Sequence, residues 1–155
     1  MARFQTFIES SAAIAADTGF AWLMSSANNG YLLRRITIGI RAGTGVPTSM
    51  QAVLGINRVT SAGTTPVAGM AAVRMRPWSA AAGAVWNQSY ATPPANGTAD
   101  FFRVPINTQS GVDLPWEFGE DVVLLNGTSN GLAFINRSNA LPASHQWVLS
   151  CEWEE

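Results

Sequence analysis

Apolar and polar positions alternate with a period of two along much of the chain, the pattern of strands with one buried and one exposed face. In residues 146–154 the core-facing positions are Trp147, Leu149, Cys151 and Trp153. In residues 31–41 the alternation predicts a strand that buries Leu32, Arg34, Ile36, Ile38 and Ile40. In residues 50–60 the inward positions are Ala52, Leu54 and Ile56. The alternation therefore predicts three long strands.

Shorter strands are expected at residues 4–9, 20–25, 71–78, 85–90, 101–106, 122–125 and 132–136. In the second of these, Phe20, Trp22 and Met24 are expected to share one face. Turn-forming Gly, Asn, Ser and Pro separate the segments. About eight to ten strands and no long helix predict an all-β fold, an antiparallel jelly-roll sandwich. Residues 1–18 are expected to form an N-terminal arm or edge strand, and residues 19–155 a single jelly-roll domain.

Composition changes the picture of the surface. The 155-residue chain has nine Arg, no Lys and ten Asp or Glu, for a net charge of −1. Its charged fraction of 12% is about half that of an average soluble domain. Burying uncompensated charge is costly, so a surface of small neutral side chains is well suited to association. Self-assembly or docking to a partner is the first expectation.

The same composition excludes several classes of function. An acidic chain without Lys argues against direct nucleic-acid binding, which needs clustered cations. One Cys and one His cannot form the usual zinc sites, and no apolar run reaches membrane-spanning length. The N-terminal segment is interrupted by Gln5 and Glu9 and is interpreted as mature protein rather than a signal peptide. No cofactor, metal or membrane contact is expected.

Residues 127–131 match the G-x-S-x-G nucleophile motif around Ser129, with His145 as the available base. No acidic residue lies between them, so the hydrolase order fails and a hairpin turn explains the match. Glu117, Glu120 and Asp121 form an acidic cluster that fits a solvated turn better than a sugar-cleaving or calcium site. The protein is therefore expected not to be an enzyme.

Arginine and aromatic residues suggest contacts instead of catalysis. Arg74 and Arg76 share a strand face, and Arg forms bidentate ion pairs at protein interfaces. Trp78 and Trp86 flank turn residues and are candidates for contacts. With Tyr90, these two tryptophans are also the candidates for an alternative role in carbohydrate binding. Cys151 lies in a core row and is expected to be an inert thiol.

Three segments resemble small jelly-roll proteins of tailed bacteriophages. They are LRRITIG at residues 33–39, GINRVTSAGTTP at 55–66, and GLAFIN at 131–136 followed by WEE at 153–155. The similarity covers most of residues 19–155. Members of this group are capsid decoration (cement) proteins, typically trimers on the outside of the head. Residues 75–78 depart from the group, in which an acidic turn containing Asp-Pro is commoner.

The resemblance implies a structural virion protein that reinforces contacts between major capsid subunits. The implied partners are two further copies in a homotrimer and the major capsid protein, and the implied location is the capsid surface after synthesis in the host cytoplasm. Phe4, Phe7 and Ile8 are expected to belong to an arm that pairs with the trimer or the capsid by strand addition. The alternative is a carbohydrate-binding or receptor-binding jelly-roll module on the phage particle.

Overall fold

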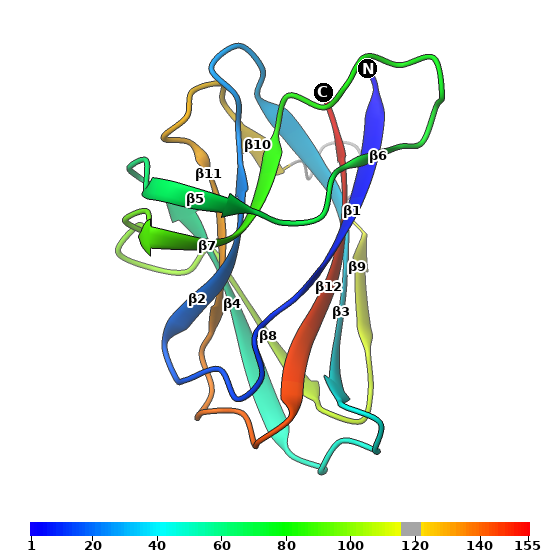
Figure 1. Ribbon diagram of the computed structural model, residues 1–155, viewed down its shortest axis with the longest axis vertical. Helices are drawn as coiled ribbons and strands as arrows, with labels where there is room; N and C mark the ends of the chain where they lie inside the picture. Colours follow the sequence, from blue (N-terminus) through cyan, green and yellow to red (C-terminus); the bar gives the residue numbers. More distant parts are fainter. Residues whose placement is uncertain (116–121) are drawn as a thin grey trace.

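A computed structural model describes residues 1–115 and 122–155, which form two six-stranded sheets and no helix. The strands are β1 (Arg3–Glu9), β2 (Thr18–Met24), β3 (Tyr31–Ala42), β4 (Gln51–Val59), β5 (Thr64–Ala68), β6 (Val73–Arg74), β7 (Val85–Thr92), β8 (Phe102–Asn107), β9 (Val112–Pro115), β10 (Val122–Leu124), β11 (Gly131–Asn136) and β12 (His145–Glu154). Figure 1 shows the sheets facing each other as a sandwich. The all-β antiparallel sandwich predicted from sequence is confirmed.

The two sheets differ in strand order. Sheet A has the order β10-β3-β12-β1-β6, with β9 also beside β3. Sheet B has the order β5-β7-β2-β11-β4-β8. The first strand thus pairs with the last, and β2 pairs with β11. The alternation predicted the long strands well, but it missed β5 and β9, and the strand expected at residues 71–78 is only the two residues of β6.

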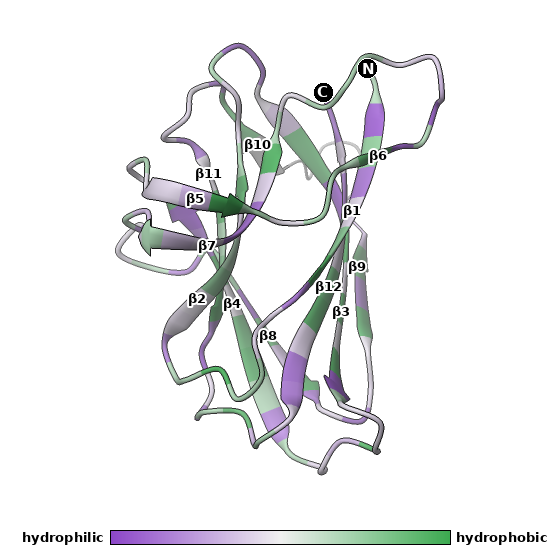
Figure 2. Ribbon diagram, viewed as in Figure 1, coloured by the Kyte–Doolittle hydropathy of each residue, from purple (hydrophilic) through white to green (hydrophobic). Residues whose placement is uncertain are grey.

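The core lies between the sheets and is built from alternating side chains of both. In β12 the predicted row is fully buried, and in β4 the predicted inward residues are too. Figure 2 shows apolar and polar segments alternating along these long strands. Aromatic side chains tie the layers together: Phe20 of sheet B stacks on Trp147 of sheet A, with ring centroids 6.1 Å apart.

Two β-bulges overturn details of the predicted alternation. In β3, Glu152 faces Arg35 and Trp153 faces Leu33, so Arg34 is an extra residue. The bulge reverses the strand's phase, and Leu33 is buried where Leu32 and Arg34 were expected. In β2 the extra residue is Phe20. Phe20 therefore faces the core, whereas Trp22 and Met24 belong to a second apolar cluster with Val59, Ala133 and Ile135.

β1 is part of the sandwich. All seven of its residues pair with β12, from Arg3 opposite Glu154 to Glu9 opposite Val148. On its other side it pairs only with the two residues of β6. Phe4 and Ile8 are 1% and 2% exposed and belong to the main core. Residues 1–18 were expected to form an N-terminal arm or edge strand; in this structure β1 pairs within its own chain, between β12 and the short edge strand β6.

Residues 60–84 form an excursion between β4 and β7 that we call the flank insertion. It contributes β5 to sheet B and then β6 to sheet A, so it crosses one flank of the sandwich (Figure 1). The amide of Met75 donates to the carbonyl of Arg3 at 2.9 Å, and the Thr6 hydroxyl donates to the carbonyl of Met70 at 3.1 Å. The flank insertion is thus hydrogen-bonded to β1 along its path.

Candidate functional site

Large apolar side chains are exposed along the flank insertion. We call Val67, Met70, Val73, Met75 and Trp78 the docking patch; all five are exposed, and Trp78 is 82% exposed. Their neighbours Ala72 and Ala82 pack against the core instead. Exposed apolar side chains scattered singly are ordinary, whereas five within residues 67–78 make this segment the candidate for contact with a partner.

Hydrogen bonds fix the end of the flank insertion, which follows the docking patch in sequence. The Glu155 carboxylate accepts hydrogen bonds from the amides of Gly83 and Ala84 at 2.7 and 2.8 Å, and from the Trp153 indole N–H at 3.0 Å. A side chain at position 83 would meet Asn29 Nδ2 at 2.8 Å, so glycine permits this close approach. The end of the flank insertion is therefore held against β12.

The arginines of the flank insertion, Arg74 and Arg76, differ from those of β3. On sheet A, Arg34 pairs with Glu154 at 2.8 Å, and Arg35 Nε donates to Asp113 at 2.7 Å. Arg74 and Arg76 are exposed, and no acidic residue within residues 1–115 and 122–155 pairs with them. Arg74 and Arg76, which alternate in sequence with Val73 and Met75 of the docking patch, are therefore two cations that an acidic partner surface could meet.

The other predicted interface residues are less available. Trp86 is 3% exposed and packs its ring against Phe134, with centroids 5.2 Å apart. Phe4 and Ile8 are buried in this chain's own core, as described above. Phe7 is 38% exposed on the outer face of β1. Of the seven predicted interface residues, the structure exposes Phe7, Arg74, Arg76 and Trp78 and buries the rest.

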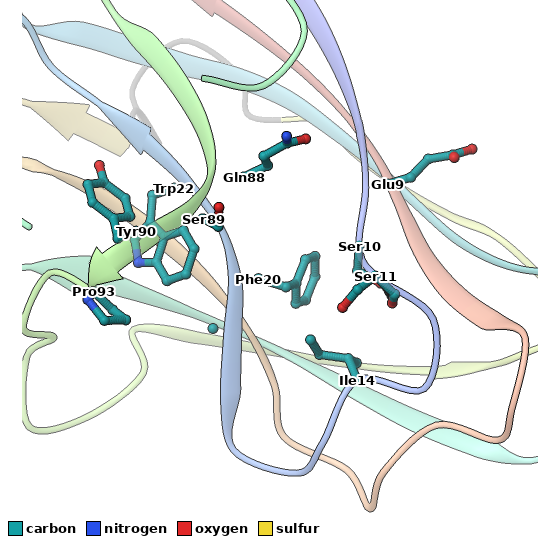
Figure 3. A pocket seen from close by; sticks show the side chains of 11 residues that line it. Glu9, Ser10, Ser11, Ile14, Phe20, Trp22, Gln88, Ser89, Tyr90 and Pro93 are labelled. Carbon is teal, nitrogen blue, oxygen red and sulfur yellow. Dashed lines mark hydrogen bonds between the residues drawn. The ribbon is translucent and has the colours of Figure 1, made fainter. Parts of the chain in front are cut away.

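A groove of about 520 Å³ opens beside Tyr90, between the end of β1, the first half of β2 and the second half of β7. Tyr90 meets Trp22 edge to face, with ring centroids 5.2 Å apart. Figure 3 shows Trp22, Ser89 and Tyr90 on one side, Glu9, Ser10 and Ser11 on the other, and Phe20 and Ile14 between them. Sequence reasoning named Tyr90 but missed the groove, because the approach of β1 to β7 is a long-range feature.

Two polar groups of the groove, the hydroxyls of Ser10 and Tyr90, already have hydrogen-bond partners within the protein. The Ser10 hydroxyl donates to the carbonyl of Ser11 and accepts from the amide of Trp147. Asn87 Nδ2 donates to the Tyr90 hydroxyl at 2.8 Å. Burial raises the pKa of Tyr90 above its ordinary value, with the Asn87 hydrogen bond opposing it, so this phenol is neutral at physiological pH.

The catalytic motif weighed in the sequence does not assemble. Ser129 lies in the turn before β11, whereas His145 begins β12 at the other end of the sandwich (Figure 1). His145 is buried, and its Nε2 accepts a hydrogen bond from the Thr48 amide at 2.9 Å. The acidic cluster of Glu117, Glu120 and Asp121 lies outside the described residues. Within the described ranges, no group of three His, Cys, Asp or Glu could hold a metal ion.

An ionic network with the buried Asp100 side chain at its centre lies on the face of sheet B opposite the core. Asp100 binds Arg137 through two hydrogen bonds, 2.7 Å from Nη2 to Oδ1 and 2.9 Å from Nε to Oδ2. Burial favours the neutral form of Asp100, but hydrogen bonds from Arg137, Arg103 and Asn57 outweigh it and hold its pKa below the ordinary value. This network explains why Asn57 and Gly55 are buried on the face of β4 opposite the core.

Among the described residues, no helix is long and apolar enough to cross a bilayer. Comparisons with protein-family models, with curated proteins and with solved structures find no match. The function must therefore be argued from the chain itself.

Proposed function

We propose that this protein is a structural virion protein that decorates the outside of a tailed-phage capsid as an oligomer, a trimer in the first instance, and reinforces contacts between major capsid subunits. The observation that carries the proposal is the docking patch, a set of large apolar side chains exposed on one segment. Specific interfaces are commonly centred on aromatic and Met side chains, with Arg among the enriched residues. Trp78, Met75 and Arg76 form such a combination within four positions of sequence.

The fold supports the same proposal. The order β1-β12-β3 in one sheet and β2-β11-β4-β8 in the other is compatible with the interleaved Greek keys of a jelly roll, with the flank insertion and β7 added between β4 and β8. The resemblance of residues 33–39, 55–66 and 131–136 to decoration proteins implies that fold and that role.

The charge distribution also agrees with docking through the flank insertion. Five of the described ion pairs occupy the outer face of sheet A, where Arg3, Arg34, Arg35 and Arg41 meet acidic partners. Desolvating those pairs would be costly. Burying the neutral docking patch is favourable, at about 25 cal/mol per Å² of apolar surface.

The test is attachment to particles of the phage that carries the gene. Light scattering should give a trimer mass for the purified protein, and a reconstruction of the particle should place it on the outer surface of the head. Trp78→Ser should weaken binding to heads stripped of the protein by about tenfold or more, since a buried aromatic anchor carries several kcal/mol.

Val46→Ser is the matched control. Val46 is as exposed as Trp78 but lies in the turn after β3, at the opposite end of the sandwich from the docking patch (Figure 1). It should leave head binding unchanged. A monomer at high concentration that is absent from particles would overturn the proposal.

A further inference from the structure

We propose that the groove beside Tyr90 is a binding site for a neutral saccharide. This goes beyond capsid docking, because the groove uses none of the residues of the docking patch. Its volume of about 520 Å³ is within the usual range of small-ligand sites, about 300–1,000 Å³. Three separate segments converge on it: the end of β1, the first half of β2 and the second half of β7.

The apolar wall of the groove is rigid. Tyr90 is held by its edge-to-face contact with Trp22, and the Trp22 ring lies close against Gly19. A Cβ added at Gly19 would lie 2.8 Å from Trp22 Cζ2, so the ring occupies the space that a side chain would need. An aromatic surface fixed in this way loses no rotamer freedom on binding. The carbon–hydrogen face of a sugar ring fits such a surface.

Polar groups with free hydrogen-bonding capacity surround that wall. Ser11, Gln88 and Ser89 line the groove and are exposed. Their side chains make no hydrogen bond to another described residue, and hydroxyl and amide groups can both donate and accept. The ring hydroxyls of a saccharide present the same dual capacity, so the chemistry of ligand and lining matches.

Trp22 reports on occupancy of the groove. Its indole N–H is shielded from solvent and has no partner among the described residues. Because that atom is closed to solvent, a bound sugar would contact the ring of Trp22 and not the N–H, whose signal then senses the ligand through the ring.

Charge selects a neutral ligand. Among the described residues, Glu9 is the one charged residue that lines the groove, and its carboxylate is paired with Arg41 at 2.9 Å. No cation among the lining residues that the structure describes would attract a sulfated, phosphorylated or carboxylated sugar.

The test uses the purified full chain and no phage particles, so its outcome is independent of capsid docking. An array of neutral and acidic bacterial-surface and animal oligosaccharides identifies the tightest neutral binder, which is then titrated calorimetrically. Ser89→Trp fills the groove from an exposed position and should weaken binding about tenfold or more. Gln51→Ala, an exposed glutamine on β4, should change the affinity less than about twofold.

Amide spectra supply a second readout. On addition of the same oligosaccharide, the indole N–H signal of Trp22 should shift, whereas that of Trp147, also buried and unpartnered but in the core between the sheets, should not. The proposal is overturned if no neutral oligosaccharide binds, if only acidic ones do, or if binding is insensitive to Ser89→Trp. It is equally overturned if the Trp22 signal does not move.

Discussion

Asp100 and Arg137 form a two-point ion pair in which the Asp100 side chain is completely buried while Arg137 also reaches Asp17 at 2.9 Å. A buried charge that loses its partner is strongly destabilising. The pair therefore stabilises the contact between the end of β11 and the segment that leads into β8.

Asp100→Asn should lower the free energy of unfolding by about 3 kcal/mol, the lower end of the cost of breaking a buried pair, because Arg137 keeps Asp17. Urea denaturation measures the change. Asp113→Asn is the matched control, since the Arg35–Asp113 pair is exposed and such pairs contribute little. Equal losses in the two variants would contradict this account of the network.

The same pair predicts a pH dependence. The pKa of Asp100 is lowered in the folded state, so below the ordinary Asp pKa of about 3.9 the unfolded chain binds the proton first. The stability that Asp100 contributes is present above that pH and is lost as pH falls through the folded pKa. The difference in unfolding free energy between wild type and Asp100→Asn should be constant near neutrality and shrink below about pH 4. A difference that grows on acidification would show the sign to be wrong.

β1 contains a matched pair of phenylalanines. Phe4→Ala should cost about 3–5 kcal/mol of stability, because it empties space in the core beside Trp153. Phe7→Ala, three residues later on the outer face, should cost far less.

Deleting residues 2–18 should prevent folding altogether, since the deletion removes the β1–β12 ladder with Phe4 and Ile8. A well-dispersed amide spectrum from the truncated chain would refute this.

Cys151 offers a chemical test of burial. It lies fully buried in the core row of β12, and desolvation raises the pKa of its thiol well above the ordinary value. The thiolate is the reactive form, so Ellman's reagent should react very slowly with the native protein. One thiol per chain should react at once in concentrated guanidinium chloride. Rapid reaction under native conditions would place Cys151 elsewhere.

Glu155 provides a test of how the flank insertion is held. Glu155→Ala removes the acceptor for the amides of Gly83 and Ala84, so hydrogen exchange at both should accelerate while β12 stays protected. Glu152→Ala, a nearby acidic change on the outer face of sheet A, serves as control and should leave those two amides unchanged. Unaltered exchange in Glu155→Ala would mean that other contacts hold the segment.

The sequence allowed much of the fold to be predicted, and the failures have identifiable causes. Ala52, Leu54 and Ile56 follow an uninterrupted alternation and face the core as expected. In β3 and β2 a single bulged residue, Arg34 or Phe20, reverses the phase, and nothing local in the sequence marks it. Phe4, Thr6 and Ile8 share the buried face of β1, but polar Thr6 on that face and Phe7 on the other obscure the alternation.

The candidate site was less accessible to sequence reasoning. Trp78 and Trp86 both flank turn residues, yet one is exposed and the other packs on Phe134, a partner 48 positions away. Tyr90 was named for its side chain alone. The groove depends on Glu9 and Ser11 approaching β7, a contact set by the pairing of β1 with β12, and such long-range registers are not written in local periodicity.

The flank insertion has a mechanical consequence. A partner that pulled on Trp78 would load a segment stitched to β1 in one sheet and to β7 in the other, with the Glu155 carboxylate as a further tether. Tension would be divided between two hydrogen-bonded ladders rather than peeling one strand from an edge. The flank insertion should therefore stay folded under a pulling force that would detach a single edge strand.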